Sequence, residues 1–131
     1  MKIVLDTNVL IAAFITHGTC NELLEHCAVN HEVILSGFIL GELKDKLVRK
    51  FGFTTHEADS AAQLLTSRCA LVTPLALTEP ICRDSDDDKI IGTALAGDCE
   101  CIVTGDKDLL DLGQVKGVSM ISPSDFWAME D

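Results

Sequence analysis

Short apolar runs alternate along the chain with amphipathic stretches of helical length. Five runs have the length and apolar content of buried strands: residues 2–6, 31–35, 70–73, 101–104 and 118–121. The stretches between and after them predict helices over residues 9–15, 19–29, 36–50, 54–68, 89–96, 106–110 and from 122 onward. Buried strands that alternate with helices form a parallel sheet with helices on both faces, so the pattern predicts one α/β domain over residues 1–131.

Two of the predicted helix starts have the Thr-x-x-Glu spacing of a capping box. Thr19 is followed by Glu22, and Thr54 is followed by Glu57. In a capping box the threonine side chain bonds the third helical amide while the glutamate bonds the threonine amide. We therefore expect Thr19 and Thr54 to be N-cap residues.

Composition places the protein among globular chains, with 47% hydrophobic and 24% charged residues. The longest uninterrupted apolar run, residues 9–15, is too short to span a membrane. Asp6 and Asn8 interrupt the N-terminal segment where a signal peptide would have its apolar core. These features predict a cytoplasmic protein with no membrane contact.

The cysteines and histidines give no metal-ligand spacing. The cysteines have apolar neighbours and no CxxC pair, so we expect free, mostly buried thiols at Cys20, Cys27, Cys69, Cys82, Cys99 and Cys101. The histidines are scattered and are interpreted as surface or helix-face residues: His17, His26, His31 and His56.

Negative charge is concentrated in the second half of the chain. The formal charge is −11; residues 1–65 hold five basic and eight acidic side chains, and residues 66–131 hold five and thirteen. Proteins that bind nucleic acid usually carry a basic face, so this balance argues against RNA unless some carboxylates bind divalent cations. Charge alone therefore does not exclude a nucleic-acid partner.

Carboxylates recur where ligands bind in an open parallel sheet, outside the carboxyl ends of the strands. Asp6 follows the first strand, Asp106 follows the fourth, Glu42 lies in the helix after the second, and the acidic run 84–88 enters a helix. Like charges gathered in this way raise one another's pKa unless a counter-charge is present. Because Mg²⁺ and Mn²⁺ prefer oxygen ligands, the pattern favours a metal site suited to phosphodiester hydrolysis by water.

Several other sites are excluded by spacing. Asp84, Asp86 and Asp88 match three positions of a calcium loop, but Lys89 and Leu95 replace its glycine and its bidentate glutamate. The chain has no GxGxxG after the first strand, no P-loop and no GxSxG. Asn8 stands where haloacid-dehalogenase phosphatases need a second aspartate.

Four motifs, in order over almost the whole chain, resemble those of PIN-domain ribonucleases, in particular bacterial toxins akin to VapC. They are IVLDTNVLI at residues 3–11, SGFILGEL at 36–43, CRDSDDDKIIGTAL at 82–95 and VTGDKDLL at 103–110. The resemblance implies a three-layer α/β/α fold with a central, mainly parallel five-stranded sheet. It also implies a metal-dependent endoribonuclease, with RNA as substrate, an antitoxin protein as partner and a homodimer.

The resemblance also implies a set of site residues. Asp6, Glu42 and Asp106 match the first, second and fourth family acids. Together with the third family acid, they would bind Mg²⁺ or Mn²⁺. The register favours Asp88 as the third, with Asp87 and Asp86 as alternatives. Secondary residues implied around the metal are Asn8, Thr104, Asp87 and Asp108.

The basic residues leave two interpretations open. The strongest basic cluster, at the end of the helix that holds Glu42, either guides phosphates to the metal or is an ordinary solvated face: Lys44, Lys46, Arg49 and Lys50. The leading hypothesis is a metal-dependent ribonuclease and toxin. The alternatives are a non-catalytic PIN-fold module that binds through a dimer or antitoxin interface, and a phosphatase or DNA-structure nuclease on a related fold.

Overall fold

A six-stranded sheet lies at the centre of the protein. The structure is a computed structural model that describes residues 1–16 and 18–130. The strands are β1 (Lys2–Leu5), β2 (Glu32–Ser36), β3 (Ala70–Val72), β4 (Cys101–Val103), β5 (Gln114–Val115) and β6 (Val118–Ile121), in the order β3-β2-β1-β4-β6-β5. All neighbours are parallel except β5 and β6. The predicted mainly parallel sheet is confirmed.

The sixth strand, β5, was not predicted from the sequence. It is only two residues long and pairs with the start of β6. Lys116 and Gly117 between them have φ angles of 50° and 85°, the left-handed pair typical of a two-residue hairpin turn. A strand this short gives no apolar run for sequence analysis to detect.

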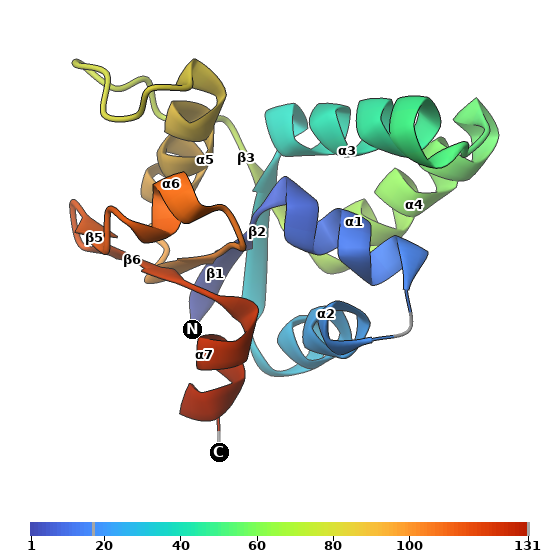
Figure 1. The fold of residues 1–131 in the computed structure, drawn as a ribbon, viewed down its shortest axis with the longest axis horizontal. Coiled ribbons are helices and arrows are strands. Elements are labelled where there is room, and N and C mark those ends of the chain that lie inside the picture. The colour runs from blue at the N-terminus through green and yellow to red at the C-terminus, as the bar shows by residue number, and fades with distance from the viewer. Residues whose placement is uncertain (17, 131) are drawn as a thin grey trace.

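Within the described residues, seven helices surround the sheet. They are α1 (Thr7–Ile15), α2 (Thr19–Asn30), α3 (Gly37–Phe51), α4 (Thr55–Arg68), α5 (Ser85–Ala96), α6 (Lys107–Leu110) and α7 (Pro123–Met129). Figure 1 shows α1 to α4 on one side of the sheet and α5 and α6 on the other, which is the expected three-layer arrangement. In the part of the chain that the structure describes, no helix combines the length and apolarity needed to cross a membrane.

Two helices begin earlier than the sequence pattern placed them, and the N-cap of a third lies one residue earlier than predicted. Asp6 caps α1, which therefore starts at Thr7, and Asp84 caps α5, so the acidic run forms the first turn of that helix. The N-cap of α2 is Gly18 rather than Thr19, whose side chain lies outside the described part. In each case a residue with extended backbone just before the apolar pattern begins the helix.

The capping box before α4 is confirmed. The Thr54 hydroxyl oxygen accepts a hydrogen bond from the Glu57 amide at 3.0 Å, and Glu57 Oε1 accepts one from the Thr54 amide at 2.9 Å. These contacts lower the pKa of Glu57. The thiols are also as predicted: all six cysteines are free, and Cys27, Cys99 and Cys101 are buried.

Substitution of Gly92 tests how closely α5 packs against the backbone of Leu75. Its carbonyl accepts a hydrogen bond from the Leu75 amide at 2.9 Å, and a Cβ at position 92 would lie 2.4 Å from the Leu75 carbonyl oxygen. We expect Gly92→Ala to lower the free energy of unfolding by about 1–3 kcal/mol, because the contact is with backbone that cannot rotate away. Urea denaturation measures the change.

The matched control is Gly41→Ala in α3, where no atom lies within 4 Å of the added Cβ. This variant should gain about 0.5–1 kcal/mol from helix propensity. Equal effects at the two positions would contradict the close packing of residue 75 on α5.

Candidate active site

The carboxyl ends of β1 and β4 meet at one edge of the sheet. The two strands pair in register, with Leu5 opposite Val103, so the residues that follow them, Asp6 and Thr104, are neighbours. The chain leaves β1 through α1 on one side, while α5 leads into β4 from the other. A reversal of this kind leaves a crevice at the strand ends, where ligands bind in open α/β sheets.

Asp6 is the most buried of the predicted acids, with 6% of its surface exposed. Its Oδ1 accepts a hydrogen bond from the Thr7 amide at 2.7 Å, and its Oδ2 accepts one from Thr104 Oγ1 at 2.7 Å. Burial raises the pKa of Asp6 above its usual value, and the charge of Asp106 adds to this, while the two hydrogen bonds and Lys46 oppose it. The carboxylate is therefore held in one orientation at a cost in solvation.

Thr104 connects Asp6 to Asp106. Its hydroxyl donates to Asp6 and accepts a hydrogen bond from the Asp106 amide at 3.0 Å. Asp106 is in turn the N-cap of α6, and its Oδ1 accepts a hydrogen bond from the Asp108 amide at 2.9 Å. One buried hydroxyl thus sets the relative position of two predicted acids.

Thr7 makes the corresponding connection to Glu42, and sequence analysis did not single it out. Its Oγ1 donates to Glu42 Oε1 at 2.7 Å while its amide holds Asp6. Thr7 is buried, whereas Asn8 is exposed and makes no side-chain hydrogen bond with another described residue. The only available signal for Thr7 was its place in the polar segment that follows β1.

The aspartates of the acidic run face different partners because they lie in a helix, where successive side chains are about 100° apart. Both carboxylate oxygens of Asp88 accept from the Ile81 amide, at 3.2 and 3.3 Å, and Oδ1 also accepts from the Cys82 amide at 2.8 Å. Asp88 also borders an apolar pocket of about 420 Å³ lined by residues 74–77 and Pro80. Its carboxylate therefore anchors the loop before α5.

Asp87 instead lies within the electrostatic influence of the other acids. Burial, followed in order by the charges of Asp106, Asp84, Asp6 and Asp108, raises its pKa to about 6. Asp86 lies 3.9 Å from the Lys89 ammonium, in an exposed pair. Of the three candidates for the third acid, Asp87 is the one whose pKa is raised by the charges of Asp6 and Asp106.

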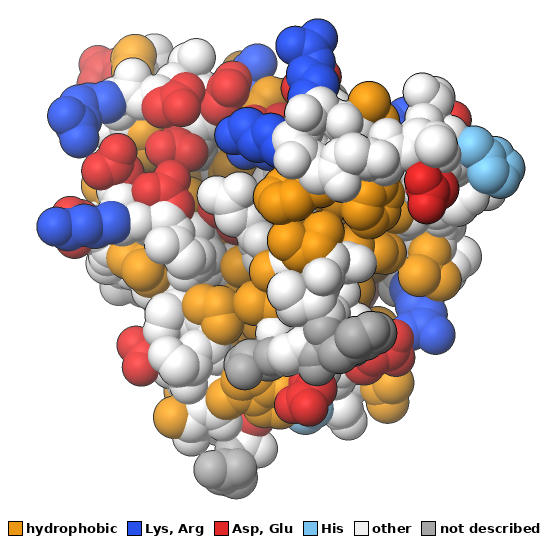
Figure 2. Space-filling view, turned by 45° about the vertical axis from the view of Figure 1, so that its right-hand side comes forward, with side chains coloured by type: hydrophobic (Ala, Val, Ile, Leu, Met, Phe, Trp, Pro, Cys, Tyr) orange, Lys and Arg blue, Asp and Glu red, His pale blue; other side chains and the backbone are white. Residues whose placement is uncertain are grey.

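The donor set around this edge suits a hard divalent cation. It consists of carboxylate and hydroxyl oxygens, and the charges of neighbouring aspartates add to burial in raising the pKa of Asp87. Figure 2 shows acidic side chains gathered on the upper left of the molecule, with lysine and arginine side chains around them. The residues fit Mg²⁺ or Mn²⁺ better than a soft metal.

Of the four basic residues in α3, Lys46 is the one that acts on Asp6. Lys44 pairs with Asp59 at 3.7 Å and Arg49 pairs with Asp45 at 2.8 Å. Lys46 lowers the pKa of Asp6 and lies one helical turn after Glu42, on the same face of α3. Within the basic cluster, Lys44 and Arg49 thus form ion pairs, whereas Lys46 acts on the candidate site.

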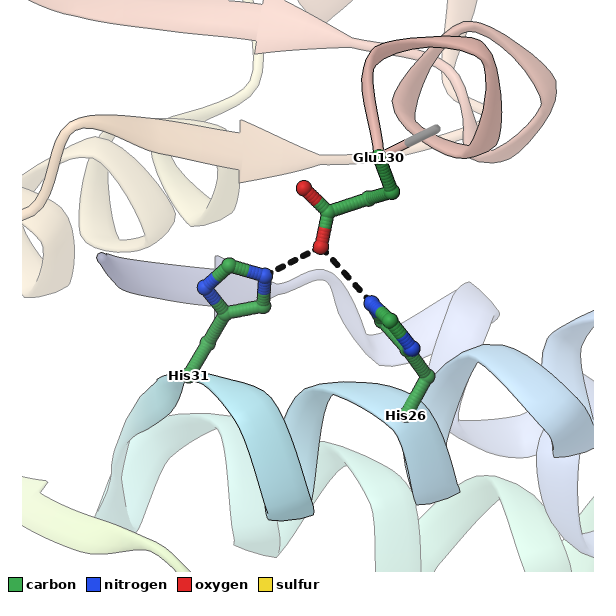
Figure 3. A group of neighbouring side chains, drawn as sticks. All are labelled: His26, His31 and Glu130. Carbon is green, nitrogen blue, oxygen red and sulfur yellow. Dashed lines mark hydrogen bonds and ion pairs between the residues drawn. The ribbon is translucent and has the colours of Figure 1, made fainter.

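Two of the histidines are not scattered, contrary to the interpretation of the sequence. His26 and His31 both contact Glu130, more than 95 positions along the chain, as Figure 3 shows. Among the described residues, this group is the one set of three His, Cys, Asp or Glu side chains whose ligand atoms all lie within 4.8 Å of one another. His17 lies outside the described residues.

The fold is similar to that of solved VapBC and VapC structures. A chain of VapBC2 from Rickettsia felis, bound to a DNA fragment from their promoter, matches with a TM-score of 0.66 and 17% identity, covering 93% of this chain and 98% of that one. A chain of VapBC-1 from nontypeable Haemophilus influenzae matches with a TM-score of 0.65 and 17% identity, covering 95% and 99%. VapC20 of Mycobacterium tuberculosis, a sarcin-ricin loop cleaving toxin, matches with a TM-score of 0.65 and 19% identity, covering 87% and 97%.

Sequence comparison identifies the family. No curated protein sequence matches the chain significantly. The family model described as PIN domain matches residues 2–108, which hold every acid of the candidate site. The chain belongs to the PIN domain family.

Proposed function

We propose that the protein is a divalent-metal-dependent endoribonuclease that hydrolyses RNA phosphodiester bonds, and that it is the toxin of a toxin–antitoxin pair. The observation that carries this proposal is the buried Asp6, held by two hydrogen bonds and connected through Thr104 and Thr7 to Asp106 and Glu42. Crowded carboxylates cost folding free energy. A fold that holds them rigidly is best explained by a cation that they bind.

The set of acids that we propose is Asp6, Glu42, Asp106 and Asp87. Asp87 takes the third place in preference to Asp88, because Asp88 already accepts hydrogen bonds from two backbone amides while the charges of Asp6 and Asp106 act on Asp87. Bound Mg²⁺ or Mn²⁺ supplies an activated water and stabilises the charge that develops on the leaving oxygen. The chain itself supplies rigid oxygen ligands and the hydroxyls that fix their orientation.

The toxin assignment rests on the similarity of fold to VapC20 and to the VapBC structures. By the same reasoning we propose an antitoxin protein as a partner, a homodimer as the assembly and the cytoplasm as the location. The direct experiment is to incubate the purified protein with single-stranded and structured RNA in Mn²⁺, in Mg²⁺ and in EDTA. Cleavage in either metal that EDTA abolishes supports the enzyme, and metal binding without cleavage of any RNA supports the non-catalytic module.

We expect Lys46→Gln to weaken the binding of RNA without slowing the chemical step. Lys46 acts on Asp6 and has no ion-pair partner among the described residues, so its ammonium is free to contact a substrate phosphate. The KM for RNA should rise about three- to tenfold with kcat unchanged, and the dependence of binding on salt should become shallower by roughly one counterion. Steady-state kinetics at several salt concentrations measure both.

Lys44→Gln is the control for this variant, because Lys44 lies on the same helix and pairs with Asp59. It should leave KM and the salt dependence unchanged. If the two variants behave alike, the cluster acts as a solvated face and Lys46 does not position RNA.

A further inference from the structure

The cluster formed by His26, His31 and Glu130 brings together two distant parts of the chain. His26 lies in α2, His31 is the residue that ends it, and Glu130 is the residue that ends α7. Figure 3 shows both imidazole rings directed at the same carboxylate oxygen. Oε1 of Glu130 accepts from His26 Nε2 at 2.7 Å and from His31 Nε2.

The three side chains are held in place and largely withdrawn from solvent, with 26%, 12% and 15% of their surfaces exposed for His26, His31 and Glu130. Asn30 Nδ2 lies 3.2 Å from His26 Nδ1. Trp127 packs on the His26 ring with 4.9 Å between centroids, and Phe126 packs edge-on against His31 at 5.7 Å. Rigid rings around a shared point are the preorganisation that a metal site needs.

His31 can take the tautomer that metal binding requires without losing a hydrogen bond. Its Nδ1 is buried and has no hydrogen-bond partner among the described residues. A metal bound at Nε2 requires the ring hydrogen to be on Nδ1. Because Nδ1 makes no bond now, moving the hydrogen there breaks none.

From these observations we propose that His26 Nε2, His31 Nε2 and a carboxylate oxygen of Glu130 bind a first-row transition-metal dication of the Zn²⁺ type. Two imidazoles and one carboxylate form a donor set that zinc uses in proteins, with water in the remaining position. The cation takes the place of the two hydrogens that the imidazoles now share with Glu130, and each hydrogen moves to Nδ1 of its ring. In His26 this displaces the hydrogen bond from Asn30 Nδ2. It also differs in chemistry from the all-oxygen site that we propose for Mg²⁺ or Mn²⁺.

The bound metal would fasten α7 to α2. The match to the PIN domain model ends at residue 108, so Glu130 lies beyond it and the site joins the family core to the segment that follows. A structural metal stabilises the folded state in proportion to its affinity, because the unfolded chain does not hold the three ligands together. Zn²⁺ should therefore raise the Tm of the protein.

Trp127 makes the site measurable, since it is the only tryptophan in the chain and contacts His26. We expect Ni²⁺ to quench its fluorescence with a stoichiometry of one, and Zn²⁺ to reverse the quenching by competition. His26→Gln and Glu130→Gln should each weaken Ni²⁺ binding at least about tenfold, since even loss of an outer residue that orients a ligand costs that much. His56→Gln, at an exposed position in α4, is the matched control and should bind Ni²⁺ like the parent.

Asp6→Asn separates this proposal from the proposed nuclease. That variant should keep the Ni²⁺ response of Trp127, whatever becomes of RNA cleavage. The proposal is wrong if the parent shows no saturable quenching, or if His26→Gln and Glu130→Gln, folded by circular dichroism, bind Ni²⁺ as tightly as His56→Gln. Zn²⁺ binding that persists in both variants would report the cysteine thiols instead.

Discussion

Asp6→Asn is expected to lower the rate of RNA cleavage in Mn²⁺ at least about a hundredfold, since Asp6 would hold the cation that stabilises the developing charge, and the loss of such stabilisation has effects of that size. The variant keeps the shape of the side chain, and its amide can hydrogen-bond both Thr7 and Thr104. Burial raises the pKa of Asp6, so the ionised carboxylate costs stability at neutral pH. The free energy of unfolding at pH 7 should therefore not fall.

The control for this variant is Asp125→Asn, an exposed aspartate in α7 away from the sheet edge. It should cleave RNA at the rate of the parent. Mn²⁺ should raise the Tm of the parent and of Asp125→Asn, and should leave that of Asp6→Asn unchanged, because a ligand stabilises only the state that binds it. Undiminished cleavage by Asp6→Asn would remove the basis of the proposed metal site.

The fold was predictable where burial leaves a periodic pattern. All five apolar runs that were assigned as strands are strands, because in a parallel sheet covered on both faces most strand positions are apolar. Strand β5 was not predictable, since two residues that pair only with a hairpin neighbour carry no such pattern. The starts of α1 and α5 were placed too late because their first turns are polar, and the caps Asp6 and Asp84 were the signal available.

The candidate site was predictable as a location but less so as a set of contacts. Asp6, Thr104 and Asp106 follow directly from the strand ends on which they lie. The choice between Asp87 and Asp88 depends on the loop before α5, whose amides at positions 81 and 82 point at Asp88. The contact between His26 and Glu130 joins residues 104 positions apart, and no local spacing indicates it.

The two neighbouring aspartates of α5 should respond to substitution in opposite ways. Asp87→Asn should lower RNA cleavage at least about a hundredfold and raise the stability of the protein, because the charges of four other aspartates, which this change leaves in place, oppose the ionisation of Asp87. Asp88→Asn should lower the free energy of unfolding by roughly 1–3 kcal/mol, since it weakens charged hydrogen bonds to two amides. Its effect on the cleavage rate should be below about tenfold.

The dependence of stability on pH decides between the two assignments independently of activity. The pKa of Asp87 is raised from 3.8 to about 6 in the folded protein, so its favourable contribution is complete below about pH 4 and is lost as the pH rises through 6. At this partly exposed side chain solvent screening limits the loss to roughly 1 kcal/mol. Urea denaturation between pH 4 and 7 should show that decline in the parent and in Asp88→Asn, and not in Asp87→Asn. If the decline disappears in Asp88→Asn instead, and cleavage disappears with it, then Asp88 is the third acid and Asp87 is a solvated residue.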